Sequence, residues 1–184
     1  MNSVMVDIET LGVRIGSAVV SIGAVLFDPF SDELGDTFVV NLALQEQVDR
    51  GALVDISTIK WWMNQSNEAK KAAFSSNDEI SVVEGLNKFS KFLSENGAEN
   101  LRLWSNGPSF DSVQLQSLYG KYNIRWPLRY DADRDCRTIF ELAYPEGKVP
   151  VGDIGTAHNA LDDAIWQSKA VQLCVQTLRT GLPE

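Results

Sequence analysis

The residues that could do chemistry in this chain are acidic side chains and one histidine, spread over three separate stretches. The first stretch contains Asp7 and Glu9, two positions apart in a run where Val4, Val6 and Ile8 alternate with other residues. This alternation predicts a β-strand, and residues i and i+2 of a strand share a face. The two carboxylates are therefore expected to point the same way, where a cation between them would relieve their repulsion. Two solvated acids at a strand end are the plainer alternative.

The second stretch is a turn at residues 105–108, after which Phe110 leads into Asp111. An acid in this position stabilises the start of a helix, because free backbone N–H groups and the helix dipole favour negative charge there. Taken alone, Asp111 fits that structural role, and Phe110 fits a core position.

The third stretch begins at His158, the only histidine of the chain, and continues through Asn159 to Asp162 and Asp163. Asn159 is the predicted cap of the last helix. Five residues of regular helix separate two side chains by about 140°, so His158 can share a site with Asp163 only from a loop before the helix. The alternative is structural: both acids complement the helix N-terminus, and the histidine has no catalytic role.

Together, the three stretches resemble the three motifs of the DEDDh 3′–5′ exonucleases, a family that includes polymerase proofreading subunits and ribonuclease T. The motifs are Asp7-Ile8-Glu9-Thr10, residues 106–111 and residues 158–164, and their order and spacing match over nearly the whole chain. Residues 20–25, 58–66 and 133–138 resemble more narrowly the phage and prophage exonuclease branch, which is related to a mycobacterial 3′–5′ exoribonuclease. The resemblance implies a ribonuclease H-like fold.

The resemblance also implies two Mg²⁺ or Mn²⁺ ions, one to activate water and the other to stabilise the departing 3′ oxygen. Asp7 would bridge both ions. Glu9 and Asp163 would hold the water-activating ion with it, and Asp111 the other ion through water. His158 would accept the proton of the attacking water. The neighbouring Asp162 is interpreted as a helix-start or surface charge, with an indirect role at the site left open.

Substrate contacts follow partly from the resemblance, which places a backbone contact at Thr10, an apolar wedge at Leu11 and a flank of the terminal base at Phe110. Two adjacent tryptophans lie on a predicted helix about 100° apart, so one is expected in the core and the other exposed. Packing of both in the core is the alternative, and the resemblance to the phage branch implies that one faces a base or a partner subunit. Arg137 could reach a phosphate or pair with an acid such as Asp133. The predicted substrate-binding residues are Thr10, Leu11, Trp61, Trp62, Asn106, Phe110 and Arg137.

The elements that must position these residues are predicted from hydrophobic period and turn signals. Strands are expected over residues 3–8, 18–27, 37–42 and 101–104. Helices are expected after a cap at Ser57 or Thr58, over 68–74, from a cap at Asn77 or Asp78 to 96, over 110–122 and 137–143, and from 159 onward. This order predicts an α/β fold with a mixed β-sheet flanked by α-helices. Residues 1–184 show no repeat or linker and are interpreted as one exonuclease domain.

Composition narrows the class of protein. With 44% hydrophobic residues among 184, the chain can bury a core. Cys136 and Cys174 lie far apart, which indicates neither a zinc site nor a disulfide framework, and favours a reducing compartment. Residues 17–27 form the longest apolar stretch, too short for a membrane span, and no secretion signal is visible. We therefore expect a cytoplasmic protein that does not bind membranes. If the gene belongs to a phage or prophage, the compartment would be the cytoplasm of the bacterial host.

The sequence as a whole predicts a metal-dependent 3′–5′ exonuclease acting on single-stranded 3′ ends, with DNA favoured over RNA. The net charge of −9 argues against tight binding along a duplex but permits a short grip on one chain end, where bound cations return positive charge. The alternatives are a 3′–5′ exoribonuclease or oligonucleotide hydrolase with the same site, and a nucleic-acid-binding domain that has lost catalysis. A homodimer is also compatible with the sequence.

Overall fold

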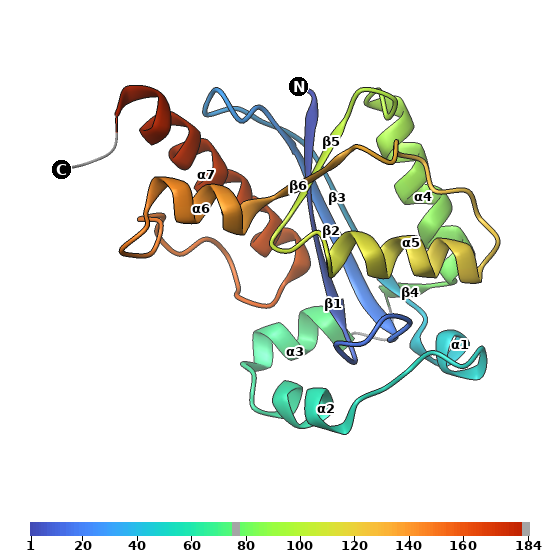
Figure 1. The fold of residues 1–184 in the computed structure, drawn as a ribbon. Coiled ribbons are helices and arrows are strands. Elements are labelled where there is room, and N and C mark those ends of the chain that lie inside the picture. Colours follow the sequence, from blue (N-terminus) through green and yellow to red (C-terminus); the bar gives the residue numbers. More distant parts are fainter. Residues whose placement is uncertain (75–77, 182–184) are drawn as a thin grey trace.

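The computed structural model describes residues 1–74 and 78–181. Its centre is a six-stranded mixed sheet with the strand order β4-β3-β2-β1-β5-β6 (Figure 1). The strands are β1 (Ser3–Thr10), β2 (Val19–Phe27), β3 (Leu34–Leu42), β4 (Glu79–Ile80), β5 (Arg102–Ser105) and β6 (Asp133–Asp135).

The direction of the strands brings separate parts of the chain to one edge of the sheet. β1 runs antiparallel to β2, with Asp7 opposite Gly23, and β2 runs antiparallel to β3. On its other side β1 runs parallel to β5, which in turn runs parallel to β6. The carboxyl ends of β1, β5 and β6 therefore lie at the same edge, which is where open α/β sheets usually bind ligands.

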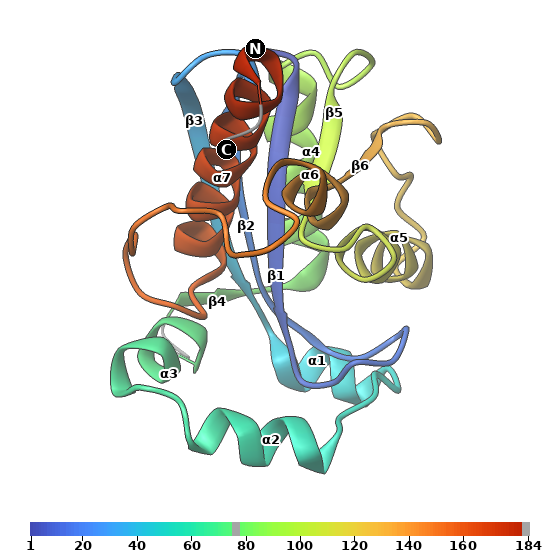
Figure 2. The same cartoon turned by 60° about the vertical axis from the view of Figure 1, so that its left-hand side comes forward.

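Helices cover both faces of the sheet. α4 (Val82–Glu95) and α5 (Asp111–Lys121) lie on one face, and α6 (Cys136–Ala143) and α7 (Ala160–Thr180) on the other (Figure 1). Three further helices of the described ranges gather at the end of the molecule beyond the β1–β2 loop (Figure 2). They are α1 (Leu44–Asp49), α2 (Ile56–Met63) and α3 (Asn67–Phe74).

The alternation predicted for the first strand divides its side chains between two cores. Val4, Val6 and Ile8 pack into the cluster formed with α4 and α5, whereas Met5 packs into the cluster formed with α6 and α7. Each face thus has its own apolar layer, as expected of a strand covered on both sides. The predicted α/β class and mixed sheet are confirmed.

Two predicted helix starts are wrong. The helix expected to have its cap at Ser57 or Thr58 starts two or three residues earlier, with Asp55 at the cap position. Of the two caps expected for the next long helix, Asn77 lies outside the described residues, and Asp78 does not cap it. The cap is Ser81, whose hydroxyl accepts a hydrogen bond from the Glu84 N–H at 3.2 Å.

Three short elements were not predicted. They are α1, β4 and β6, of which β4 is two residues long and β6 consists of Asp133, Arg134 and Asp135. None of the three is long enough to show a hydrophobic periodicity in the sequence. The two short strands are defined by their pairing with longer strands, β4 with β3 and β6 with β5. Cys136 and Cys174 are buried free thiols. None of the helices in the described ranges is long and apolar enough to cross a membrane.

Candidate active site

A cavity of about 410 Å³ opens at the carboxyl ends of β1 and β5. Side chains from all three predicted motifs line it. The lining residues are Asp7, Ile8, Glu9, Asn106, Phe110, Asp111, Arg137, His158, Asp163, Trp166 and Gln167. Four carboxylates and the only histidine of the chain, distant in sequence, therefore surround one space.

β1 supplies two of these carboxylates from one face. Asp7 and Glu9 both reach the cavity, as their i, i+2 spacing predicts. The β1–β2 register shifts between Glu9 and Thr10, an irregularity of the kind that re-aims side chains near active sites. Glu9 is 9% exposed and lines the cavity.

The turn after β5 supplies Asp111. The N–H groups of Phe110 and Asp111 both donate to the Gly107 carbonyl, at 2.8 and 3.2 Å, and Gly107 has a φ of 137° that favours glycine. This tight turn ends the strand and starts α5 at Asp111, which is 5% exposed. The acid that resembled an ordinary helix-start charge is thus buried against β1.

The loop before α7 supplies His158. Its backbone has a φ of 65°, a left-handed conformation that is uncommon for any residue except glycine. The next residue, Asn159, caps the helix, its side chain accepting from the N–H groups of Leu161 and Asp162 at 3.1 and 3.2 Å. Because His158 lies outside the helix, the chain can fold back over Asp163, whose carboxylate accepts from the His158 N–H at 2.9 Å.

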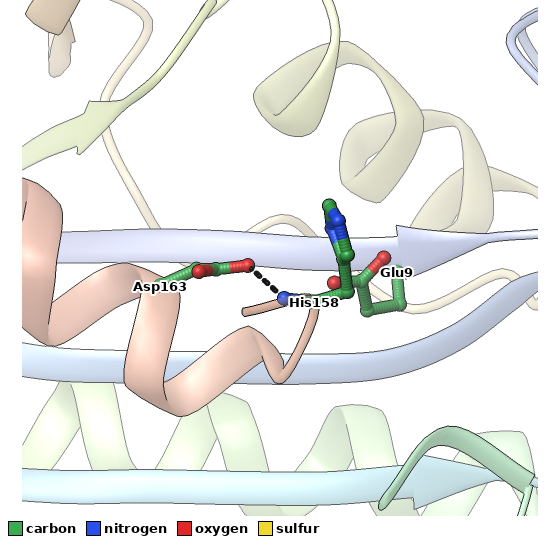
Figure 3. A group of neighbouring side chains, drawn as sticks. All are labelled: Glu9, His158 and Asp163. Atoms are coloured by element: carbon green, nitrogen blue, oxygen red, sulfur yellow. Dashed lines mark hydrogen bonds between the residues drawn. The ribbon is translucent and has the colours of Figure 1, made fainter. Parts of the chain in front are cut away.

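These residues form a compact group of possible ligands. One ligand atom each from Glu9, His158 and Asp163 lies within 4.8 Å of the other two. Figure 3 shows the imidazole beside Glu9 and the backbone hydrogen bond that ties His158 to Asp163.

The environment of the cavity disfavours the ionised form of the acids that line it. Burial raises the pKa of Asp7 well above its ordinary value, and three carboxylates raise it further, namely Asp111, Glu9 and Asp163. Burial, followed by the charges of Asp163 and Asp111, raises the pKa of Glu9 to about 8. Four acids of this kind need either protons or cations to neutralise them.

The remaining two acids follow the same trend. Burial raises the pKa of Asp111 to about 7, although backbone N–H groups, the Ser105 hydroxyl and the charge of Arg137 oppose the rise. Burial also raises the pKa of Asp163, opposed by the hydrogen bond from the His158 N–H and by the charge of that residue. A divalent cation bound among these acids would neutralise much of their negative charge.

Comparison with known proteins places the whole arrangement in one family. Residues 2–175 match the model of the 3′–5′ exoribonuclease Rv2179c-like domain. The chain belongs to this family. The Rv2179c-like match covers all three motifs of the cavity and includes nearly all of the sheet and helices that carry them, so the resemblance read from the motifs to the DEDDh 3′–5′ exonucleases is confirmed.

A curated relative of this Rv2179c-like chain is the exodeoxyribonuclease of Enterobacteria phage T4. The two are 31% identical over 123 residues, which is 62% of this chain and 54% of the phage protein. The chain thus spans about half the length of that relative.

Solved structures share the fold of this Rv2179c-like chain at low sequence identity. The nuclease domain of 3′hExo, a DEDDh family member solved with bound rAMP, has a TM-score of 0.66 at 14% identity, covering 97% of this chain and 92% of that one. Escherichia coli exonuclease I in complex with a dT13 oligonucleotide also has a TM-score of 0.66, at 13% identity, covering 93% and 40%. The ribonuclease H-like architecture of the DEDDh exonucleases is thereby confirmed.

The structure brings only some of the predicted substrate-binding residues to the cavity. Asn106, Phe110 and Arg137 line it. Thr10 and Leu11 do not: the Thr10 hydroxyl donates to the Gly12 carbonyl at 2.8 Å, and the Leu11 side chain is buried with α2 and α3. Their substrate contacts stay predictions, to which the observed side-chain positions lend no support.

The two tryptophans divide as the helical spacing predicts. Trp62 is buried at 3% exposure and donates from Nε1 to the Thr10 carbonyl at 3.0 Å. Trp61 is 42% exposed, and its ring meets the His158 ring edge to face at 4.7 Å between centroids. The exposed tryptophan is therefore Trp61, and it lies beside the cavity.

Arg137 lines the cavity and does not pair with Asp133. No ion pair of Arg137 occurs in the part of the chain that the structure describes, and the Asp133 carboxylate instead accepts from the Ser112 hydroxyl at 2.8 Å. Asp135 caps α6, its side chain accepting from the Arg137 N–H at 3.1 Å. This hydrogen bond fixes the backbone of Arg137 in the first turn of the helix.

Two residues that line the cavity, Trp166 and Gln167, were not predicted from the sequence. For Asp162, the sequence predicted no specific partner. Trp166 and Gln167 lie three and four residues after Asp163, the spacing that puts helical residues on one face, and this signal could have found them. Asp162 accepts from the Thr156 N–H at 2.8 Å, bracing the loop that carries His158. It is therefore more than a surface charge.

Proposed function

We propose that this chain is a divalent-metal-dependent 3′–5′ exonuclease that releases nucleoside 5′-monophosphates from single-stranded nucleic acid. The observation that carries the proposal is the convergence of Asp7, Glu9, Asp111, Asp163 and His158 on one cavity, in a chain that belongs to an exonuclease family over residues 2–175. Four acids gathered and buried in this way are costly unless they bind a cation.

The residues present suit Mg²⁺ or Mn²⁺. All four acids offer hard oxygen ligands, which these ions prefer, and burial raises the pKa of each acid. Asp7 would contact both ions, with Glu9 and Asp163 on one side and Asp111 on the other. Bound there, the ions would supply an activated water and charge stabilisation for the leaving oxygen.

His158 is proposed to accept the proton of the attacking water. The left-handed backbone of this residue, the Asn159 cap and the bond from its N–H to Asp163 together hold the imidazole at the mouth of the acid cluster. Such positioning matters because a general base must come within hydrogen-bond reach of the proton that it removes.

The 3′ end would be held by the polar and aromatic rim. Arg137 offers a guanidinium for a phosphate, and Phe110 and Trp61 offer rings for the last bases. We propose single-stranded DNA as the preferred substrate, following the phage exodeoxyribonuclease relative. RNA is the second candidate, favoured by the family description. A homodimer stays a prediction.

A substrate panel tests the proposal. A 5′-labelled 20-residue strand in Mg²⁺ should shorten one nucleotide at a time from its 3′ end, and a blocked 3′ terminus should stop the reaction. Chelator should stop it as well. Internal cleavage, or degradation past the blocked end, would contradict 3′–5′ exonuclease action. DNA and RNA strands of equal sequence separate the two substrate candidates.

The same panel separates the other readings. Turnover that rises as the strand shortens from twenty nucleotides to two would favour an oligonucleotide hydrolase. Binding to the strand without any product in Mg²⁺ would favour a domain without catalysis.

A further inference from the structure

Gln167 makes a contact to the acid cluster that the proposed mechanism does not use. It lies on α7 one turn after Asp163 and is 4% exposed. Its Nε2 donates to Asp7 Oδ1 at 2.7 Å. Among the described residues, this is the only side-chain hydrogen bond that Asp7 receives.

The chemistry of an amide suits this position. Asp7 already faces three other carboxylates and has acceptor sites for more than one partner. A lysine or arginine would also donate, but its positive charge would compete with cations for the site. A neutral amide fixes the orientation of one carboxylate oxygen and leaves the negative charge of the cluster intact.

The other end of the same amide is unsatisfied. Gln167 Oε1 is buried and has no hydrogen-bond partner among the described residues, and Gln167 lines the cavity. A buried acceptor without a partner costs about 1–3 kcal/mol. Because this oxygen is buried, the contact that Gln167 makes with the acid cluster is the one through Nε2.

We propose that Gln167 is a positioning residue of the metal site, which orients the Asp7 carboxylate through the hydrogen bond from Nε2. The proposal rests on the divalent metal site of the proposed function. It adds a contact outside the four acids, and it explains why an uncharged residue is buried against a carboxylate that faces three others.

The chain contains a matched control on the same helix. Gln172 is also 4% exposed, and its Oε1 is likewise buried without a partner among the described residues. Its Nε2 donates to the carbonyls of Asp28 and Glu33, at 3.0 and 2.8 Å, and it does not line the acid cavity. Replacing either glutamine by methionine removes a buried amide of the same size from the same helix.

The test is Mn²⁺ affinity without nucleic acid, measured by titration calorimetry and by electron paramagnetic resonance of free Mn²⁺. We expect Gln167→Met to weaken binding about 10- to 100-fold, the usual effect of removing a partner of a metal-binding side chain. Gln172→Met should bind as the wild type does, whatever it costs in thermal stability. Gln167→Asn retains the amide but shortens its reach, and should lose affinity as well.

Two results would overturn the proposal. One is Gln167→Met binding Mn²⁺ within twofold of the wild type. The other is equal loss in the Gln167 and Gln172 variants, which would indicate general destabilisation of α7. Should Gln167→Met fail to fold by circular dichroism, the Gln167→Asn comparison decides the same question. A wild type that binds Mn²⁺ but degrades no strand would contradict the proposed function and leave the affinity comparison intact.

Discussion

Gly23 lies directly opposite Asp7 in the β1–β2 ladder, and the space left by its missing side chain is occupied by the start of α7. A Cβ on Gly23 would lie 2.2 Å from the carbonyl carbon of Ala160. The backbone of α7 therefore passes against the sheet at the position of the central acid. This close approach sets how far His158 and Asp163 stand from Asp7.

Gly23→Ala should consequently displace the active-site residues of α7, although Gly23 itself does not line the cavity. A methyl group there pushes the first turn of α7 outward, and a shift of about 1 Å in a catalytic group can cost about 10²-fold in rate. We expect mononucleotide release from a labelled strand to fall at least that far, together with a lower melting temperature. Gly120→Ala is the matched control, because a Cβ on Gly120 of α5 meets nothing within 4 Å. Wild-type turnover in Gly23→Ala would contradict this role of the α7 contact.

Asp162→Ala should slow catalysis although Asp162 is not one of the proposed metal ligands. The Asp162 carboxylate accepts from the Thr156 N–H, two residues before His158 in sequence, and lies where a Cβ on Gly155 would stand. Losing this brace loosens the loop, so we expect kcat to fall about 10-fold with KM little changed. The control is Asp153→Ala, which removes an exposed acid of the same loop. Equal kcat values for the two variants would show that the hydrogen bond between Asp162 and the Thr156 N–H does not position His158.

The raised pKa values predict how the metal-free protein responds to pH. The folded state keeps a proton on Glu9 up to about pH 8, whereas the unfolded chain releases it near 4.5. Between these values the folded state binds more protons, so the free energy of unfolding falls as pH rises. Asp111, with its pKa raised to about 7, acts in the same direction.

Melting curves in chelator from pH 5 to pH 8.5 measure this effect. We expect the melting temperature to drop by several degrees, since about 1 kcal/mol corresponds to about 2–4 °C in a domain of this size. Mg²⁺ should restore stability most at high pH, where the acids are ionised. Glu9→Gln should flatten the curve, and Glu95→Gln, which changes an exposed acid of α4, should not. A melting temperature that rises with pH would show that the acids are not buried together.

Trp61 permits a test that separates two roles. If its exposed ring stacks on a base, Trp61→Ala should raise KM by the equivalent of about 1–3 kcal/mol and leave kcat nearly unchanged. If its contact with His158 holds the imidazole, kcat should fall instead. We expect the KM effect, with Trp61→Phe recovering most of it. Met63→Ala changes an exposed residue of the same helix and serves as the control. A Trp61→Ala variant with unchanged KM would remove Trp61 from the substrate-binding residues.

Much of the site was predictable because its residues lie in short, regular stretches. The spacing of Asp7 and Glu9 in an alternating strand gave their common face, and Asn159 gave the start of the last helix. The placement of His158 outside that helix followed from the angle that helical residues would otherwise make. Each inference depends only on local geometry.

The rest depends on tertiary contacts that local patterns do not encode. Whether Leu11 forms a wedge or a core residue depends on α2 and α3 packing against it. The charged strand β6 exists because β5 offers it a partner, and the role of Gln167 depends on the side chain of Asp7 from the far end of the chain. A residue four positions after a predicted ligand is a useful place to look, but its partner is visible only in the fold.

The most direct test of the metal site is an anomalous difference map from crystals grown with Mn²⁺ and a short 3′ end. Two peaks should lie in the cavity, both adjacent to Asp7, about 3.5–4 Å apart as in other two-metal sites. Asp7→Ala crystals prepared in the same way should lack both. A map with no Mn²⁺ among Asp7, Glu9, Asp111 and Asp163, or with Mn²⁺ bound only elsewhere on the chain, would contradict the assignment of this cavity as the catalytic centre.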